Sequence, residues 1–506
     1  MVIHDSKFPT YRKILRAVFN WRNARRALLA GAVLATLATA FYLEELWRGQ
    51  RDWEAYRREF EAQGGTLDLH KLSSPPVPDE QNFAMTPVLK PLFSESSPEQ
   101  FNKYSTELGT RLEWPTAKDK DPHTDMPSGT GSWPLATLVD LEPWRKFLDQ
   151  PDILQALKKF DPILSEISVA SRRPFYRPAL DVRKLNFAGI SLFIHTGRIY
   201  VVRALAELAD GQTDRAADDT VTIFQLAKAM GNEPFMMSQL TACSIIGQGL
   251  QVVWEGLVAH RWSDAQLAEL SRELEKLDLL ADELRTARFE QAIFDDRLAQ
   301  AISGPAGLDP WFKVAPSDPQ WQFRLVEAFF PRGWIYSDRI ALLQNYQNCM
   351  SAIDAPNHRL DLVKVRAIEG NPAQEFIIRR NLFDDPFKTW TANVVPNLAG
   401  VSRTFARIQT SVDEAQVACA LERFRLASGQ LPEKLDELAP KFIVKLPPDI
   451  ISGGPLHYQR KANGHFLLYA VGENGTDDGG ITAINDDHEV DWQHGDWVWP
   501  DAVKQP

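Results

Sequence analysis

The chain has 506 residues and a net charge of −11 at neutral pH, so we expect two or three domains. Hydrophobic residues make up 44% of the chain and charged residues 24%, which is ordinary for globular proteins. An acidic body repels phosphate groups, which argues against a nucleic-acid partner. Cys243, Cys349 and Cys419 form no C-x-x-C pair, so they indicate neither a zinc site nor a redox motif. Their disulfide status stays open.

The charge is unevenly distributed along the chain. Residues 1–26 contain seven basic residues against one aspartate, a net charge of +6, so the rest of the chain sums to −17. Residues 473–501 contain nine acidic residues and no Lys or Arg. The sequence therefore predicts a basic N-terminal tail and an acidic segment near the C-terminus.

An uncharged, mostly apolar run occupies residues 27–43. As a helix it spans about 26 Å, the short end of what a bilayer core requires. Basic residues precede it and Glu44 and Glu45 follow it, so the positive-inside rule places residues 1–26 in the cytoplasm and the rest outside. We expect lipid to contact the apolar side chains of the run: Ala27, Leu28, Leu29, Val33, Leu34, Leu37, Phe41 and Leu43. These features predict a single-pass transmembrane signal anchor.

A cleaved signal peptide is the alternative, because Ala38-Thr39-Ala40 matches a small-residue cleavage site. The basic region before the run is long for a signal peptide. The helical pattern also continues past the site through Trp47, Trp53, Tyr56 and Phe60. We therefore favour the anchor, and whether the site is cleaved stays open.

Residues 44–64 read as an amphipathic helical stalk that ends at Gly64-Gly65. Residues 65–136 contain ten prolines, a density that disfavours long helices. The segment also contains apolar side chains such as Phe83, Leu89 and Phe93, too many for a solvated tether. We expect it to lie extended against a helical body.

Residues 137–400 are predicted to form a large, irregular helical domain of stacked hairpins. The stretch from Ser263 to Gln266 matches a capping box. Leucines recur behind it at spacings of three and four through Leu284, as in one seam of packed helices. Aromatic residues are dense in residues 311–336. They predict either packing between domains, which we favour, or a binding groove.

Residues 401–506 predict a small α+β module. A helix runs from Val401 to Ser428 and ends at Gly429. Two strand-like runs follow, joined at Asn463-Gly464, a hairpin signal. Residues 492–499 are expected to add a third strand. The fold class is therefore mainly α, with a transmembrane helix, a helical domain and a terminal α+β module.

The stretches LERFRLASGQLPEKLDELAP, PLHY, FLLYAVGENGTDDGG and DWVWP occur in this order from Leu421, near the end of this helix, to Pro500. This order resembles the C-terminal, type II secretion major-pseudopilin-like module of uncharacterised membrane-anchored bacterial proteins of planctomycete and verrucomicrobial type. PPVPDEQNFAMTP in the proline-rich segment resembles them too. The resemblance implies an inner-membrane protein with its bulk in the periplasm and with envelope or secretion proteins as partners. The pseudopilin leader is not present in this sequence.

Major pseudopilins bind calcium in the loop after their sheet hairpin, and the resemblance carries this site to Asp477 and Asp478. Glu473 and Asn474 in the same loop offer further oxygens. Calcium takes six to eight oxygen ligands, and glycines let a backbone curl around the ion. The spacing is not that of an EF-hand, and a solvated acidic turn is the alternative. Calcium is thus the one candidate cofactor.

Catalytic motifs are absent from the sequence, which has no H-E-x-x-H, G-x-S-x-G, P-loop or G-x-G-x-x-G pattern. We assign no catalytic residue, and we expect a membrane-anchored structural or interaction protein outside the cytoplasm. The first alternative is a peptide- or glycan-binding module that uses the helical domain. A metal-dependent hydrolase that uses the acidic tail is a weaker alternative.

Overall fold

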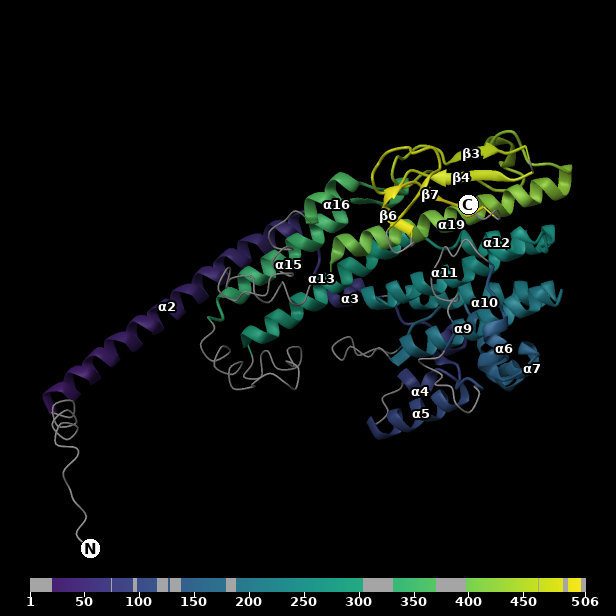
Figure 1. Ribbon diagram of the computed structural model, residues 1–506. Coiled ribbons are helices and arrows are strands. Elements are labelled where there is room, and N and C mark those ends of the chain that lie inside the picture. The colour runs from purple at the N-terminus through teal and green to yellow at the C-terminus, as the bar shows by residue number, and fades with distance from the viewer. Residues whose placement is uncertain are drawn as a thin grey trace, which may run out of the picture. The chain divides into compact units, whose positions relative to one another are not determined.

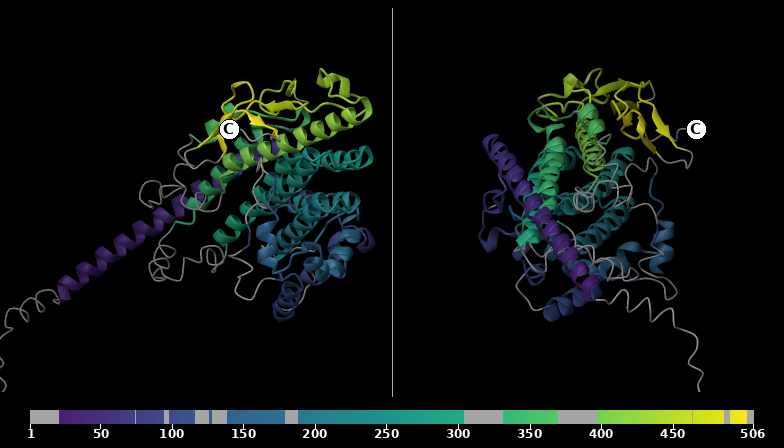
Figure 2. Two further views of the ribbon diagram at one scale, coloured as in Figure 1. Left: turned by 45° about the vertical axis from the view of Figure 1, so that its right-hand side comes forward. Right: turned by 90° about the vertical axis from the view of Figure 1, so that its left-hand side faces the viewer.

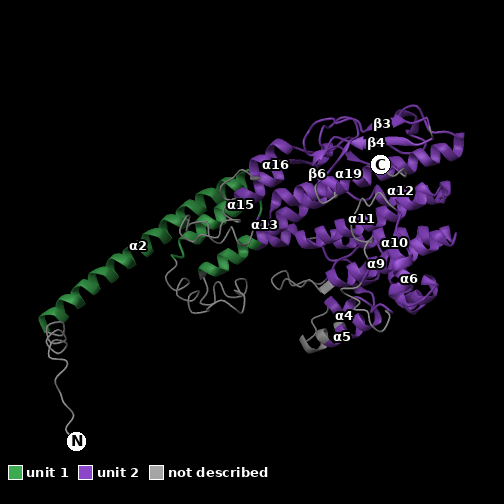
Figure 3. Ribbon diagram, viewed as in Figure 1, with its two compact units in different colours: residues 1–66, 294–343, 379–394 green, residues 67–293, 344–378, 395–506 purple. Residues whose placement is uncertain are grey.

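The computed structural model describes residues 21–73, 75–93, 98–115, 126–127, 138–178, 188–303, 331–369, 397–462, 464–485 and 490–501. The described residues are mainly helical, as predicted. They divide into two compact units (Figure 3). Unit 1 comprises residues 1–66, 294–343 and 379–394, and unit 2 comprises residues 67–293, 344–378 and 395–506. The predicted helical domain and the C-terminal module thus fall largely in one unit.

Unit 1 contains α2 (Trp21–Ala62), one unbroken helix of 42 residues that includes the predicted anchor and stalk (Figure 1). Gly64 follows it with a φ of 87°, a left-handed conformation that favours glycine and ends the helix. The unit also contains residues 294–303 of α13 (Leu279–Ser303) and residues 334–343 of α15 (Trp334–Ser351).

The proline-rich segment in unit 2 forms short helical turns, α3 (Leu69–Leu72), η1 (Asp79–Gln81), η2 (Phe83–Met85) and α4 (Lys90–Phe93). It also contains α5 (Pro98–Arg111), a helix of 14 residues. The segment is therefore less extended than its proline count predicts. Pro98 occupies the first position of α5, where its missing N–H costs nothing.

Apolar side chains of this segment lie in the core of unit 2, as predicted. Phe83 packs against the rings of Tyr176 and Phe193 at centroid distances of 5.7 and 6.0 Å. Asn82 Nδ2 donates to Arg177 O at 2.8 Å. The segment is thus fastened to the helical body by both apolar and polar contacts.

A second group of short helices follows: α6 (Glu142–Leu148), α7 (Ile153–Leu157), η3 (Lys158–Phe160) and α8 (Asp161–Ser171). Their aromatic side chains form a compact cluster with Trp114. The ring of Trp114 lies 5.3 Å from that of Trp144 and 5.9 Å from that of Phe160. Burial of these large rings gives the short helices the stability that their length alone does not.

The centre of unit 2 is an up-down-up array of α9 (Ala188–Ala209), α10 (Thr213–Gly231) and α11 (Met236–Val258). Short connections make the neighbouring helices antiparallel. Gly211, with a φ of 79°, turns the chain between α9 and α10. α12 (Asp264–Leu274) follows and packs against α10. Ser263 and Gln266 form the predicted capping box at its start.

The leucine seam that begins in α12 does not continue as one helix. α12 ends at Leu274, and Asp278 starts α13 by accepting a hydrogen bond from Ala281 N at 3.0 Å. Beyond α15, β1 (Ile353–Asp354) and β2 (Arg359–Leu360) pair around η4 (Ala355–Asn357), and α16 (Leu362–Glu369) follows.

The C-terminal part is built on α19 (Leu398–Ser428), a helix of 31 residues that ends at the left-handed Gly429. β3 (His457–Arg460) and β4 (Phe466–Ala470) lie on one side of α19, and α11 and α12 lie on the other (Figures 1 and 2). The sheet is antiparallel with the order β3-β4-β7, where β7 is Trp497–Val498. The predicted helix and hairpin are therefore present.

The third strand differs from its prediction. Residues 490–495 form β6 (Val490–Gly495), which pairs with β5 (Thr482–Ile484) in a separate hairpin, and only β7 joins the main sheet. The break lies at Gly495, whose φ is 70° and which has no room for a Cβ atom beside Ile481 O. Asp496 N donates to Ile481 O at 2.8 Å, which fixes this bend.

Candidate functional site

The apolar part of α2 is exposed along its whole length. Its most hydrophobic window of 18 residues has no buried position and is long and apolar enough to cross a membrane. Thr36 and Thr39 donate their hydroxyls to backbone carbonyls one turn earlier, each at 2.8 Å, which satisfies these groups without water. Trp21 and Trp47 are 79% and 63% exposed, at positions that suit the two membrane interfaces.

Beyond the apolar part, one face of α2 is buried inside unit 1. Glu45 accepts hydrogen bonds from Trp334 Nε1 at 2.9 Å and from Arg48. One turn later Gly49 packs against the backbone of Gly333. Trp53 stacks under the guanidinium of Arg339, whose centre lies 3.8 Å from the ring centroid. The stalk is thus a packed helix rather than a solvated spacer.

The four residues predicted to bind calcium make hydrogen bonds and ion pairs with different partners. Asp477 Oδ1 accepts hydrogen bonds from Tyr469 Oη and Gly479 N, both at 3.0 Å. These donors hold the pKa of Asp477 below its usual value. Asn474 Nδ2 donates to Asp478 Oδ2 at 2.7 Å. The loop therefore brings Asn474 and Asp478 together and turns Asp477 towards β4.

Glu473 instead turns to the helices, where its carboxylate lies 2.6 Å from Arg403 Nε. Its carbonyl accepts a hydrogen bond from Arg366 at 2.6 Å. Within the described parts of the chain, no three His, Cys, Asp or Glu side chains are grouped so that they could hold a metal. Asp486 and Asp487, which follow β5 in the sequence, lie outside the described residues. Calcium binding stays a prediction.

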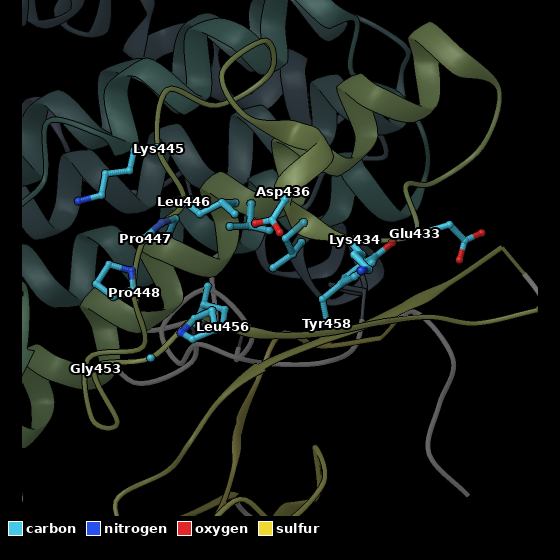
Figure 4. A pocket seen from close by; sticks show the side chains of 14 residues that line it. Glu433, Lys434, Asp436, Lys445, Leu446, Pro447, Pro448, Gly453, Leu456 and Tyr458 are labelled. Atoms are coloured by element: carbon cyan, nitrogen blue, oxygen red, sulfur yellow. The ribbon is translucent and has the colours of Figure 1, made fainter.

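A groove of about 580 Å³ lies in the C-terminal part between η6 (Leu435–Leu438) and residues 445–458. Its floor is apolar, and Lys445, Pro447 and Pro448 lie across it from Lys434, Glu433 and Tyr458 (Figure 4). Its four charged side chains are exposed. The Tyr458 hydroxyl donates to Pro432 O at 2.9 Å. The groove thus has an apolar floor and a solvated rim.

A second pocket has a more ordered polar wall, at the C-terminal end of α11. His260 follows this helix with a φ of 50°. His260 N donates to Leu257 O at 3.0 Å and Arg261 N to Gly256 O at 2.8 Å, the hydrogen bonds of a Schellman cap. Glycine is the usual residue at such a position, because it has no Cβ atom to disfavour the left-handed conformation.

The His260 side chain is held by a carboxylate of α19. Its Nδ1 lies 2.9 Å from Glu422 Oε1. Arg425 donates to both oxygens of Glu422, each at 2.6 Å. The Glu422 side chain is only 7% exposed, so this carboxylate is a buried acceptor shared by two cationic or protonatable groups.

The opposite wall repeats this arrangement with residues of the sheet. Asp501 Oδ1 lies 2.9 Å from His465 Nδ1, and its Oδ2 accepts from Lys461 Nζ at 2.8 Å. The neighbouring Pro500 O accepts from Trp254 Nε1 of α11 at 2.9 Å. This bond ties the end of the sheet to the helical body.

The space between the two walls measures about 320 Å³, near the lower end for small-molecule pockets. Its polar side chains are His260, Glu422, Arg425, His465 and Asp501. The apolar lining comes from α11, α19, the turn after α19 and the first residue of β4, and includes Leu257, Val258, Ala418, Leu431 and Phe466. The pocket therefore combines polar and apolar surface in similar proportion, and the polar part includes two histidine–carboxylate pairs.

The helical body also contains acids buried away from this pocket. Glu283 of α13 accepts hydrogen bonds from Ser402 and Cys349, and burial raises its pKa to about 8. Glu290 accepts from Tyr346 Oη at 3.1 Å, and burial raises its pKa to about 7. Burial thus lets both groups hold their protons to a higher pH than exposed glutamates do.

Sequence reasoning missed the pocket and the buried acids. Glu422 lies 162 residues from His260, and Ser402 lies 119 residues from Glu283. No short motif links such positions. The one local signal is a histidine at a helix end where glycine is usual, next to Arg261 and the buried Trp262.

The comparisons with known proteins do not extend this picture. No family model, no curated protein and no solved structure matches the chain.

Proposed function

We propose that the chain is a bacterial inner-membrane protein with one anchor helix, which holds a structural or interaction domain outside the cytoplasm. The observation that carries the proposal is the exposed apolar half of α2, continuous with a stalk that packs in unit 1. Burying so much apolar surface in lipid is favourable. Seven basic residues in residues 1–26 favour a cytoplasmic N-terminus.

The pseudopilin-like character of the C-terminal part belongs to the same proposal. A long helix covered by a small antiparallel sheet is the arrangement that the sequence resemblance implies. It supports a role among envelope or secretion proteins, which we propose as the partners. The alternative of peptide or glycan binding relied on aromatic residues 311–336. Residues 311–330 lie outside the described part, and Trp334 bonds Glu45 within unit 1.

Membrane extraction tests the anchor. We expect the full chain to stay in the membrane pellet after alkaline carbonate and to be released by detergent. The variant Leu34→Arg/Leu37→Arg places two charges in the apolar run, each costing about 3 kcal/mol at a span centre, and we expect it to be lost from the pellet. The matched control Val363→Arg/Val444→Arg changes two exposed residues of unit 2 and should remain. Release of the unaltered chain by carbonate would contradict the anchor.

Labelling of single cysteines tests the orientation. The three native cysteines are buried, so their background with an impermeant maleimide should be low. We expect Glu275→Cys, at an exposed position, to be labelled in intact spheroplasts, and Ser6→Cys only after permeabilisation. The reverse pattern would place the body in the cytoplasm. A mature N-terminus at Phe41, read by mass spectrometry, would show a cleaved signal peptide instead.

A further inference from the structure

The pocket between His260 and Asp501 has two carboxylates that are each already engaged by donors of the protein. Glu422 is engaged by His260 and by two nitrogens of Arg425. Asp501 is engaged by His465 and Lys461. A carboxylate can only accept hydrogen bonds, so the Nδ1 atoms of both histidines carry their protons.

Arg425 in this wall has a donor that its carboxylate partner does not engage. Glu422 binds Nε and Nη2 of Arg425, and this leaves Nη1 without a bond to that carboxylate. The side chain of His260 is 60% exposed, so its Nε2 is accessible. This atom is a donor only in the imidazolium form, because Nδ1 carries the proton of the neutral ring. The unused Nη1 of Arg425 favours a ligand that brings acceptors, and charged oxygens are the strongest acceptors for an arginine.

Charge balance favours the same ligand. With neutral histidines, Arg425 and Lys461 balance Glu422 and Asp501, so an added anion meets no excess of negative charge. Protonation of either histidine would make the walls positive. Leu257, Val258 and Phe466 supply apolar surface to the pocket, and apolar surface favours an apolar or aromatic body on the ligand.

The backbone of His260 gives independent support. The left-handed turn at φ 50° is the place for glycine, and the cap hydrogen bonds involve only backbone atoms. The cap alone therefore does not require a histidine side chain. An uncommon conformation of this kind points to a role for the side chain itself, and here the side chain bonds Glu422 at the edge of the pocket.

We propose that this pocket binds a small amphipathic organic anion, with its carboxylate or phosphate at Arg425 and at the imidazolium form of His260, and its apolar body against Leu257 and Phe466. This proposal does not depend on the membrane anchor. The ligand is of a size that about 320 Å³ can enclose.

The test is calorimetric titration of the full chain in phosphatidylcholine nanodiscs, with empty nanodiscs as the blank. The probes are 4-phenylbutyrate, phenyl phosphate and the uncharged 4-phenylbutyramide. We expect saturable binding of at least one anion and binding of the amide about tenfold weaker, the loss expected from one charge-assisted hydrogen bond. Comparing the two anions distinguishes a carboxylate from a phosphate ligand. Equal affinity for acid and amide, or no saturable binding of either anion, would overturn the proposal.

Four variants localise the binding. Arg425→Gln and His260→Asn should each weaken the anion about tenfold, and asparagine tolerates the left-handed turn. Leu257→Trp should abolish binding by filling the pocket without removing a charge. Arg272→Gln removes an exposed arginine of α12 and should change nothing. A thermal melt of each variant checks folding, and unchanged affinity in both folded Arg425→Gln and folded Leu257→Trp would rule out this pocket.

Discussion

Gly49 of α2 and Gly333 before α15 lie so close that neither position has room for a Cβ atom. One built on Gly49 would overlap Gly333 O, and one built on Gly333 would overlap the backbone of Glu45. Both residues belong to unit 1. Their contact lets two backbones approach where side chains would separate them, and it places Trp334 Nε1 within 2.9 Å of Glu45.

Gly49→Val should therefore destabilise unit 1. The added side chain must displace the backbone at Gly333, and overpacking of this kind costs about 1–3 kcal/mol. Limited proteolysis of the stalk should speed up in this variant. Gly31→Ala is the matched control, since nothing lies within 4 Å of a Cβ there. Equal proteolysis rates for both variants would contradict the close packing.

Burial of Glu283 and Glu290 predicts a chain that is more stable in mild acid. Their pKa values rise to about 8 and about 7 in the folded state, whereas an unfolded glutamate has a pKa of about 4.3. Between these values the unfolded chain releases protons that the folded chain keeps. The free energy of unfolding then falls as pH rises, by up to about 1.4 kcal/mol per pH unit for each group. Denaturant unfolding at pH 5 and pH 8 measures this slope.

Glu283→Gln should flatten that slope and raise stability at pH 8, because glutamine imitates the protonated acid and keeps an acceptor for Ser402 and Cys349. Glu269→Gln, at an exposed position of α12, is the control and should leave the slope unchanged. A wild-type chain that gains stability from pH 5 to pH 8 would refute the assignment of these two acids.

Arg203 and Asp219 form a buried ion pair that should behave as a unit. Arg203 donates to both oxygens of Asp219 at 2.6 and 2.7 Å, and the two side chains are 12% and 9% exposed. Arg203→Leu leaves a buried, unpaired carboxylate and should cost about 3–5 kcal/mol. Arg203→Leu/Asp219→Leu should recover most of this loss in denaturant unfolding.

The exposed ion pair of Arg57 and Glu61 provides the comparison for the Arg203 variants. Its side chains are about half exposed, so Arg57→Ala should cost less than about 1 kcal/mol. If Arg203→Leu cost no more than Arg57→Ala, burial would not be what makes the inner pair important.

Elements marked by glycine and proline could be predicted from the sequence, because these residues act locally on the backbone. Gly429 ends α19 and Gly64 ends the stalk for this reason. The prediction of one strand over residues 492–499 was wrong at Gly495, where the chain bends. This bend depends on the carbonyl of Ile481, which is distant in the sequence. The prediction of one continuous leucine seam was wrong at Asp278, where a new helix begins. The spacing of apolar residues does not reveal that Asp278 caps this helix.

The candidate pocket was beyond prediction for a related reason. Its two carboxylates, Glu422 and Asp501, meet histidines that come from other elements. Only packing of α11, α19 and the sheet brings them together. The long apolar helix at the N-terminal end, by contrast, could be predicted because seventeen uncharged residues in sequence are themselves the feature. Its role as a membrane anchor stays a prediction.

The contacts of Asp477 determine how the predicted calcium site in the acidic loop can be tested. The pKa of Asp477 is lowered by its bonds from Gly479 and Tyr469, so the group is ionised and able to act as a ligand. Its Oδ1 now accepts the Tyr469 hydroxyl and its Oδ2 lies 3.6 Å from His457 Nδ1, so a bound ion would compete with these contacts. We expect calcium to raise the melting temperature relative to a chelator, and Asp477→Asn/Asp478→Asn to lose this shift.

Tyr469→Phe distinguishes a real site from a nonspecific effect of the ion. Removing this hydroxyl leaves Asp477 Oδ1 with the Gly479 N–H and more of its capacity for calcium. The variant should therefore bind calcium at least as well as the unaltered chain, whereas magnesium at the same concentration should not reproduce the shift, because its octahedral shell suits a flexible loop poorly. An equal shift with magnesium, or a calcium shift that persists in the double asparagine variant, would remove the site.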